Sequence, residues 1–409
     1  SAAARLRRRA PLSSVPVTVS PYIKPYLMTA GPTPVPPRVS QVMAEPILYH
    51  RAPAFVPVYA RVLDRLKTVF DTENDVLCFA SSGSGAMDSA MANLVRPGDK
   101  IVVTSAGKFG ERWKELAEAY EADVAYLDVV WGEQIDPAAV DQILTDNPGA
   151  GVVFTTLSET STGVVHDIRA IAEIAHRHDA LIVADAVSGL GATELHQDEW
   201  GIDVVVSGSQ KALMTPPGMG FASVSQRALD RAAERPAGRY FFDWNKTAKG
   251  QRKDPPDSPF TPPVNLFMGL DVALDMIMTE TMPAVLERHR LLGQATRAAA
   301  KAHGLEIFGL DADAASVVTA IKTPEGVDGA AIPKLMRDKY GITIAGGQSQ
   351  LKGKIVRIAH CGYFGPFDII TSVAGLELAI HELGASVELG AGVAAAQRVF
   401  ASAGVAVGA

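Results

Sequence analysis

The sequence predicts an α/β protein with a large domain built on a mostly parallel sheet and a smaller C-terminal α+β domain. Short apolar runs alternate with amphipathic segments from about residue 54 to 226, as in βαβ units. These runs are apolar throughout, which is typical of strands that helices cover on both faces. A shorter alternation follows a long helical stretch. The chain has 409 residues, enough for two domains.

The expected strands of the large domain are runs that end at small or charged residues. They cover residues 76–80, 101–104, 124–127, 151–155, 181–184, 204–206 and 220–224. The expected helices are the amphipathic segments at 56–70, 85–95, 111–120, 137–145 and 168–178. Residues 235–263 are rich in Pro, Lys and Arg and show little periodicity, so we expect a long loop there that is either functional or disordered.

A helical stretch from about 265 to 304 is interrupted by Pro283, where we expect a hinge between the domains. The expected division is an N-terminal tail over 1–27, a large domain over 28–285 and a small domain over 286–409. The first residues are basic, so a targeting segment is the alternative to a tail. The small domain should hold strands near 316–321, 342–345 and 354–359 and helices near 329–339 and 367–383. From Gly390 onward, the Ala-, Gly- and Val-rich sequence indicates a frayed helix or a tail.

Composition places the chain among ordinary globular proteins, with 47% apolar and 20% charged residues. The net charge of −7 gives no electrostatic reason to expect nucleic acid, and no apolar stretch has the length of a membrane helix. Cys78 and Cys361 both lie in apolar runs, which suits a reducing compartment and a cytoplasmic location. The nine histidines lack metal-ligand spacing, so we expect no metal.

Two charged residues follow neighbouring apolar runs. Asp185 ends the run 181–184, and Lys211 follows the run 204–206 after a Ser-Gly-Ser-Gln turn. Ligands of parallel sheets bind beyond the carboxyl ends of the strands. A lysine and an aspartate there suit pyridoxal phosphate, because the lysine forms an imine with the aldehyde and the aspartate keeps the ring nitrogen protonated. Taken singly, each also fits a plainer role, as a surface lysine and a helix N-cap.

Small residues also join the first strand of the sheet to the next helix, in the sequence Ser-Ser-Gly-Ser-Gly-Ala over residues 81–86. A helix N-terminus with outward amides and nearby hydroxyl groups can bind a phosphate. The spacing matches neither a dinucleotide fingerprint nor a Walker loop. The alternative is an ordinary strand-to-helix turn.

Seven short motifs occur in an order that resembles the class V aminotransferases, which belong to the fold-type I superfamily of pyridoxal-phosphate enzymes. The likeness is strongest to the alanine–glyoxylate, serine–glyoxylate and serine–pyruvate aminotransferase group. The motifs lie at residues 30–36, 82–85, 159–163, 184–188, 207–211, 260–263 and 356–358. The resemblance therefore covers nearly all of the expected globular chain.

The resemblance implies a set of cofactor contacts. Lys211 would bind the cofactor covalently, and Asp185 would pair with the pyridinium nitrogen. Ser84, Gly85 and Ala86 would hold the phosphate, and Gln210 would assist; the family often has histidine at position 86, whereas Ala86 can offer only its amide. The remaining contacts would come from Phe109, stacked on the ring, and from Thr160, bonded to the ring hydroxyl.

The resemblance also implies a homodimer and a substrate site. Thr261 would reach the phosphate of the neighbouring subunit, although Ser258 stands where the family often has tyrosine. Arg357 would bind the substrate α-carboxylate, because a guanidinium fork fits a carboxylate, and Gly31 would lie at the same site. The pair of His50 and Arg51 resembles one that meets a substrate side-chain anion in phosphoserine aminotransferases. The alternatives are a structural ion pair for Arg357 and a surface position for Arg51.

We therefore expect a transaminase that moves an amino group from a small amino acid, alanine or serine, to a 2-oxo acid such as glyoxylate or pyruvate. The reaction would be ping-pong through pyridoxamine phosphate. An aspartate- or phosphoserine-type aminotransferase that uses Arg51 for a second anion is the first alternative. A cysteine desulfurase or lyase, and a non-catalytic structural subunit, are the others. We expect neither nucleic acid nor membrane as a partner.

Overall fold

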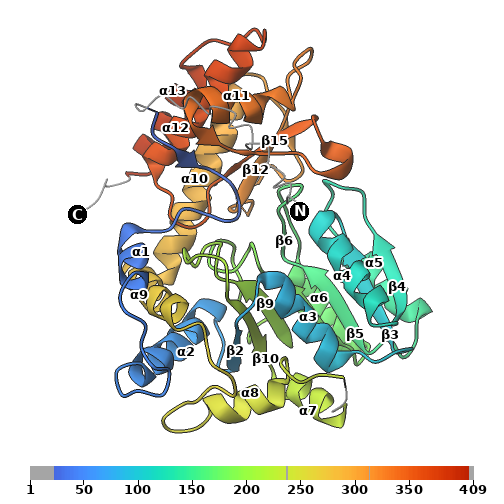
Figure 1. The fold of residues 1–409 in the computed structure, drawn as a ribbon. Helices are drawn as coiled ribbons and strands as arrows, with labels where there is room; N and C mark the ends of the chain where they lie inside the picture. Colours follow the sequence, from blue (N-terminus) through green and yellow to red (C-terminus); the bar gives the residue numbers. More distant parts are fainter. Residues whose placement is uncertain (1–22, 236–237, 313, 405–409) are drawn as a thin grey trace, which may run out of the picture.

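The fold was analysed in a computed structural model that describes residues 23–235, 238–312 and 314–404. A large α/β unit surrounds a seven-stranded sheet, and a smaller unit with its own four-stranded sheet lies at the top of Figure 1. The fold class expected from the sequence is thereby confirmed. No helix in the described part of the chain combines the length and the apolar character that a membrane crossing requires.

The large sheet has the strand order β2-β10-β9-β8-β5-β3-β4. Only β10 runs antiparallel to its neighbours, and every other pairing within this sheet is parallel. All seven strands lie where the apolar runs predicted them. They are β2 (Asp75–Phe79), β3 (Lys100–Ser105), β4 (Asp123–Asp128), β5 (Val152–Thr156), β8 (Leu181–Asp185), β9 (Val204–Gly208) and β10 (Gly220–Val224).

Helices cover both faces of this sheet (Figure 1). Neighbouring residues of one strand enter different core clusters, as Val153 and Phe154 of β5 do, so the strands must be apolar on both sides. One cluster includes side chains of α2 (Val56–Phe70), α5 (Pro137–Asp146), α6 (Ile168–Arg177) and α9 (Val264–Glu280). The other includes side chains of α3 (Gly83–Leu94), α4 (Lys108–Ala119), α7 (Gln226–Glu234) and α8 (Trp244–Gln251).

The prediction of one long loop over residues 235–263 is wrong, because helix α8 lies within that segment. The Asp243 side chain accepts a hydrogen bond from the Lys246 amide at 3.0 Å and so caps the helix. Trp244 is completely buried, and the other core-facing positions are Thr247, Ala248 and Gln251. Their spacing is helical, but the stripe covers two turns and is half polar, so hydrophobic periodicity did not reveal it.

The small unit contains the antiparallel sheet β11-β12-β15-β14. The helical stretch expected around Pro283 is two helices, which meet at Thr281, where φ is +76°. Pro283 lies in the first turn of the second helix, where proline costs no hydrogen bond. The elements of this unit are α10 (Met282–Ala302), β11 (Ile307–Phe308), β12 (Val318–Lys322), α11 (Ala331–Tyr340), β13 (Ile342–Thr343), β14 (Ala345–Gly346), η1 (Ser349–Leu351), β15 (Ile355–Ala359), α12 (Pro366–Glu382) and α13 (Ala391–Ser402).

Both ends of the described chain belong to the small unit. Residues 26 and 27, expected within a tail, form β1 (Tyr26–Leu27), which pairs in parallel with β13. The rest of that tail, residues 1–22, lies outside the described residues. The C-terminal segment is helix α13, not a tail; Ala396 is completely buried there and Phe400 is 8% exposed, both within the core cluster that also contains α10. The expected division at residues 27 and 285 stays a prediction.

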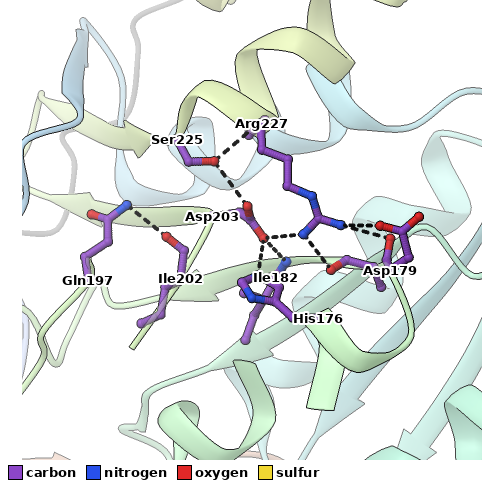
Figure 2. A network of polar contacts seen from close by, with 10 residues as sticks. His176, Asp179, Ile182, Gln197, Ile202, Asp203, Ser225 and Arg227 are labelled. Atoms are coloured by element: carbon purple, nitrogen blue, oxygen red, sulfur yellow. Dashed lines mark hydrogen bonds and ion pairs between the residues drawn. The ribbon is translucent and has the colours of Figure 1, made fainter. Parts of the chain in front are cut away.

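A buried carboxylate joins the amino ends of the central strands (Figure 2). Asp203, directly before β9, accepts hydrogen bonds from the Ile182 amide at 3.0 Å and from the Ser225 hydroxyl at 3.2 Å. His176 Nε2 lies 3.1 Å from the same carboxylate, and an Arg227 guanidinium nitrogen lies 3.5 Å away. This network ties β8, β9 and the start of α7 together at the edge opposite to the strand ends that carry Asp185 and Lys211.

Candidate active site

Residues from distant motifs meet in a cavity of about 260 Å³ at the carboxyl edge of the large sheet. β8 ends at Asp185 and β9 ends at Gly208, so their parallel pairing brings Asp185 and the turn to Lys211 to the same edge. The cavity lining includes six residues that the sequence assigned to the site: Gly31, Ser84, Phe109, Asp185, Gln210 and Lys211.

Asp185 is a buried carboxylate with few partners. It is 4% exposed, and its Oδ1 accepts a hydrogen bond from the Val187 amide at 2.8 Å. Burial raises the pKa of Asp185 to about 6, and the nearby Glu159 adds to the rise, while Arg112 and Lys211 oppose it. A positive group in the cavity would favour the ionised form, which is the state that a pyridinium partner requires.

The Lys211 amine is also buried, and it donates a hydrogen bond to the Ala30 carbonyl. Burial lowers the pKa of Lys211; Cys361 and Asp185 oppose this shift, whereas Arg357 and Arg112 add to it. A lowered pKa increases the fraction of uncharged amine, the form that attacks an aldehyde.

The segment after β1 crosses over Lys211. Gly31 has φ of +145°, and a Cβ atom there would collide with the Lys211 side chain, so glycine suits this position twice over. Thr33 donates through its hydroxyl to the Lys211 carbonyl at 2.9 Å and through its amide to the Gln210 carbonyl at 3.0 Å. The segment therefore fixes the backbone that carries the lysine.

The phosphate cradle expected at residues 81–86 is the start of helix α3, with Ser82 as N-cap. The first amides of a helix have no carbonyl to bond within it, so those of Gly83, Ser84 and Gly85 can meet an anion. Ala86 differs, because its amide donates to the Ser82 carbonyl at 3.1 Å and its methyl group is completely buried. The expected contact of the Ala86 amide with a phosphate would have to compete with this bond.

Sequence reasoning gave Glu159 no role, yet this buried side chain orders the cavity wall. Its Oε2 accepts hydrogen bonds from the amides of Phe109 and Gly110, both at 3.0 Å, at the start of α4. Its Oε1 accepts from the amide and hydroxyl of Ser161, within the hairpin of β6 (Ser158–Glu159) and β7 (Val164–Val165). Burial raises the pKa of Glu159, and these four donors oppose the rise. In the sequence, the feature that could have identified Glu159 is an acidic residue followed by a run of small ones.

Arg357 does not line this cavity, but it lies close enough for its charge to lower the pKa of Lys211. Its Nη1 donates to the Thr160 carbonyl at 2.6 Å, and its Nε and Nη2 both donate to the Gly346 carbonyl. No carboxylate pairs with it within the described residues, so the alternative of a structural ion pair is not realised there. The Thr160 hydroxyl is buried and lies 3.1 Å from the Ser188 hydroxyl.

Two assigned residues do not reach this cavity within one subunit. Arg51 lines a second cavity of about 540 Å³, where its Nη1 lies 2.6 Å from His50 Nε2 and its Nε lies 3.9 Å from Asp257. Thr261 lines a small pocket with Phe241. Any role for Arg51 or Thr261 at the Lys211 cavity therefore requires a second copy of the chain.

The chemical groups that line the cavity fit pyridoxal phosphate. It offers an amine of lowered pKa, a buried carboxylate, an aromatic side chain and a helix N-terminus. In addition, the Gln210 Oε1 atom is buried and has no hydrogen-bond partner within the described chain. A bound group that supplies a donor there would satisfy it. Within the same residues, no three His, Cys, Asp or Glu side chains are grouped to hold a metal ion.

The fold is that of the fold-type I pyridoxal-phosphate enzymes, and the cavity offers side chains that such an enzyme needs. The family model of Aminotransferase class-V matches residues 25–360, and the chain belongs to this family of pyridoxal-phosphate-dependent enzymes. It is similar to the L-aspartate–glyoxylate aminotransferase of Paracoccus denitrificans, with 34% identity over 376 residues, 90% of this chain and 94% of the relative. The serine–glyoxylate aminotransferase of Methylorubrum extorquens is 36% identical over 385 residues, 91% and 94% of the two chains.

Another relative bears a different name. The small subunit of a soluble hydrogenase from Synechococcus is 42% identical over 385 residues, 93% of this chain and 99% of the relative. Among solved structures, the ureidoglycine–glyoxylate aminotransferase of Bacillus subtilis has a TM-score of 0.86 and 31% identity, covering 92% of this chain and 97% of that one. The pyridoxamine–pyruvate aminotransferase of Mesorhizobium loti has a TM-score of 0.87 and 30% identity, with the same coverage.

Proposed function

We propose that this protein transfers the amino group of a small amino acid, alanine or serine, to a 2-oxo acid such as glyoxylate or pyruvate. The observation that carries the proposal is the cavity in which Lys211 and Asp185 meet the start of α3. Glyoxylate occurs in the names of several relatives, which supports it as acceptor. The proposed setting is a cytoplasmic homodimer.

Each residue has a separate task in the proposed reaction. Bound pyridoxal phosphate supplies an aldehyde and an electron-accepting ring. The Asp185 carboxylate holds a proton on the ring nitrogen, and the first turn of α3 holds the phosphate. Arg357 would orient the α-carboxylate of the amino acid, and Lys211 Nζ would take the proton from its α-carbon and deliver it to the cofactor carbon that carries the aldehyde. One cavity serves both half-reactions, so the kinetics are ping-pong.

The first test is chemical labelling of the purified protein. Borohydride reduction followed by peptide mapping should mark Lys211, because its buried amine has a lowered pKa and lies beside the proposed cofactor site. Candidate amino acids are then added one at a time, and the cofactor absorbance shows which of them donates. A label on another lysine would refute the assignment.

A second candidate activity, on acidic or phosphorylated amino acids, depends on Arg51. If Arg51 reaches the partner's site, Arg51→Ala should lower kcat/KM for aspartate or phosphoserine about ten- to a hundredfold, since bonds to charged groups contribute about 1.5–3 kcal/mol. Alanine turnover should hardly change. Lys253→Ala is the control, because Lys253 lines the same cavity as Arg51 and carries the same charge. Equal losses for aspartate and alanine would assign Arg51 a structural role.

The desulfurase alternative conflicts with Cys361. That chemistry needs an accessible thiolate on a mobile segment. Cys361 is completely buried, and burial raises its pKa to about 11, so the thiol stays protonated at neutral pH.

The alternative of a non-catalytic subunit is favoured by the two relatives named as soluble hydrogenase subunits, from Synechococcus and Anabaena cylindrica. Lys211 and Asp185 are both present in the cavity, which supports catalysis. A purified protein that leaves alanine and glyoxylate unchanged, with cofactor bound, would favour the structural role.

A further inference from the structure

Arg112 is a cation in the candidate active site that the roles described above do not use. It lies on α4, lines the cavity with Asp185 and Lys211, and donates through Nη1 to the Ser84 hydroxyl at 3.1 Å. Its guanidinium carbon lies 5.1 Å from the centroid of the Phe109 ring. The guanidinium is therefore held between the start of α3 and the aromatic side of the cavity.

Arg112 has no carboxylate partner within the described residues. On the same helix, Lys108 pairs with Glu111 and Glu115, and Lys114 pairs with Glu118. Arg112 instead faces a cavity that already contains the Lys211 amine and the positive end of α3. These positive groups outnumber the Asp185 carboxylate, whose pKa Arg112 and Lys211 lower, so a further anion in the cavity would reduce their repulsion.

The phosphate cradle at the start of α3 also lacks a hydrogen-bond donor at position 86. Ala86 contributes neither a side-chain donor nor a free amide, because its amide is bonded to Ser82. The neighbouring Ser84 hydroxyl is the group that Arg112 reaches. An arginine fork can bind two oxygens of a phosphate at once.

We propose that Arg112 binds the cofactor phosphate, together with Ser84 and the first turn of α3, and supplies the positive charge that position 86 does not. The inference rests on the proposed function. The substrate α-carboxylate is the other anion that Arg112 could meet. The bond to Ser84 at the N-terminus of α3 favours the phosphate, whereas the Arg357 guanidinium is bonded to the Thr160 carbonyl.

The test compares two ligands that differ only in the phosphate group. Dissociation constants of pyridoxal phosphate and of pyridoxal are measured on cofactor-free wild type, Arg112→Ala and Arg112→Lys. We expect Arg112→Ala to weaken pyridoxal phosphate binding about ten- to a hundredfold and to leave pyridoxal binding unchanged, with Arg112→Lys between them. Inorganic phosphate should compete with pyridoxal phosphate in wild type more strongly than in Arg112→Ala.

Lys114→Ala is the matched control, because it removes the same charge from the same helix on an exposed side chain. If Arg112→Ala does not fold, Arg112→Gln serves, since it keeps a donor for Ser84 and loses the charge. Equal weakening of both ligands, or an unchanged constant for pyridoxal phosphate with a raised KM for the amino acid, overturns the inference. Failure of wild type to bind pyridoxal phosphate through Lys211 would instead refute the proposed function.

Discussion

Among single residues, Asp185 is a position where stability and function conflict. A carboxylate in a buried cavity is costly without a cation beside it, and its pKa of about 6 expresses this cost. Below about pH 4, the carboxyl group is protonated in both folded and unfolded chains and contributes no difference. As the pH rises through 4 to 6, the unfolded chain ionises first, so the cofactor-free protein loses up to about 3 kcal/mol of stability.

We therefore expect cofactor-free Asp185→Asn to unfold at a higher Tm than wild type at pH 8 and at a similar Tm at pH 4. Calorimetry at the two pH values measures this difference. Asp64→Asn, on an exposed position of α2, is the control and should change neither value. A variant that is less stable than wild type at both pH values would contradict the expectation.

The same substitution should abolish most of the activity. An amide cannot hold a positive charge on the ring nitrogen, and each ~1.4 kcal/mol lost in the transition state lowers the rate tenfold. Asp185→Asn should therefore retain the cofactor, visible in its absorbance, but turn over orders of magnitude more slowly. Turnover near the wild-type rate would show that Asp185 is not the partner of the ring nitrogen.

At the scale of elements, Asp203 holds the amino ends of the central strands together (Figure 2). Its side chain is 5% exposed, so Asp203→Ala leaves buried donors without a partner and should cost about 3 kcal/mol. The midpoint of urea unfolding measures this loss. Asp179→Asn removes the charge of the completely exposed carboxylate that also pairs with Arg227, suits the φ of +56° at that position, and should cost less than about 1 kcal/mol. Equal effects would show that Asp203 adds nothing beyond a surface ion pair.

Helices and strands could be predicted where the hydrophobic pattern extends over many residues or where all the side chains of an element are buried. The strands of the large sheet are apolar on both faces, and each is several residues long. Each can therefore be recognised from its own sequence, without knowledge of the strands beside it. α8 was missed because its buried stripe mixes Trp244 and Ala248 with Thr247 and Gln251. β1 was missed because a two-residue strand has no periodicity and depends on a partner remote in sequence.

The candidate site divides in the same way. Lys211 and Asp185 were visible because charged residues at strand ends stand out in an apolar sequence. Arg112 looks like any arginine on an amphipathic helix, and its place in the cavity lining and its contacts with Ser84 and Phe109 separate it from a surface charge. Assignments that cross between subunits, such as Thr261, depend on a second chain and stay predictions.

For the whole molecule, exposed aromatic side chains near the second cavity support a dimer. Tyr49 is 62% exposed and Tyr240 is 75% exposed, and the Tyr240 ring lies 5.6 Å from that of Phe260, next to Thr261. Apolar surface of this kind is typical of an interface. The proposed homodimer would bury these side chains and carry Thr261 to the partner's phosphate.

A mixing experiment tests this arrangement. Lys211→Ala and Thr261→Arg should each be inactive, and subunit exchange between them should restore up to about a quarter of wild-type activity, because each mixed dimer holds one intact site. Each variant exchanged with itself is the control. A mixture that stays inactive after verified exchange, or a fully active monomer in sedimentation, would refute the shared site.

The pairing of β1 with β13 also determines when the pocket can form while the chain is being synthesised. Tyr26 is synthesised long before its partner Ile342, because the ribosome adds only about 5–20 residues per second. Ala30 and Gly31 reach their positions over Lys211 through that strand, so the wall that they form is absent while the chain is still growing. The pocket is therefore incomplete until Ile342 has been made, and we expect pyridoxal phosphate to bind only after that point.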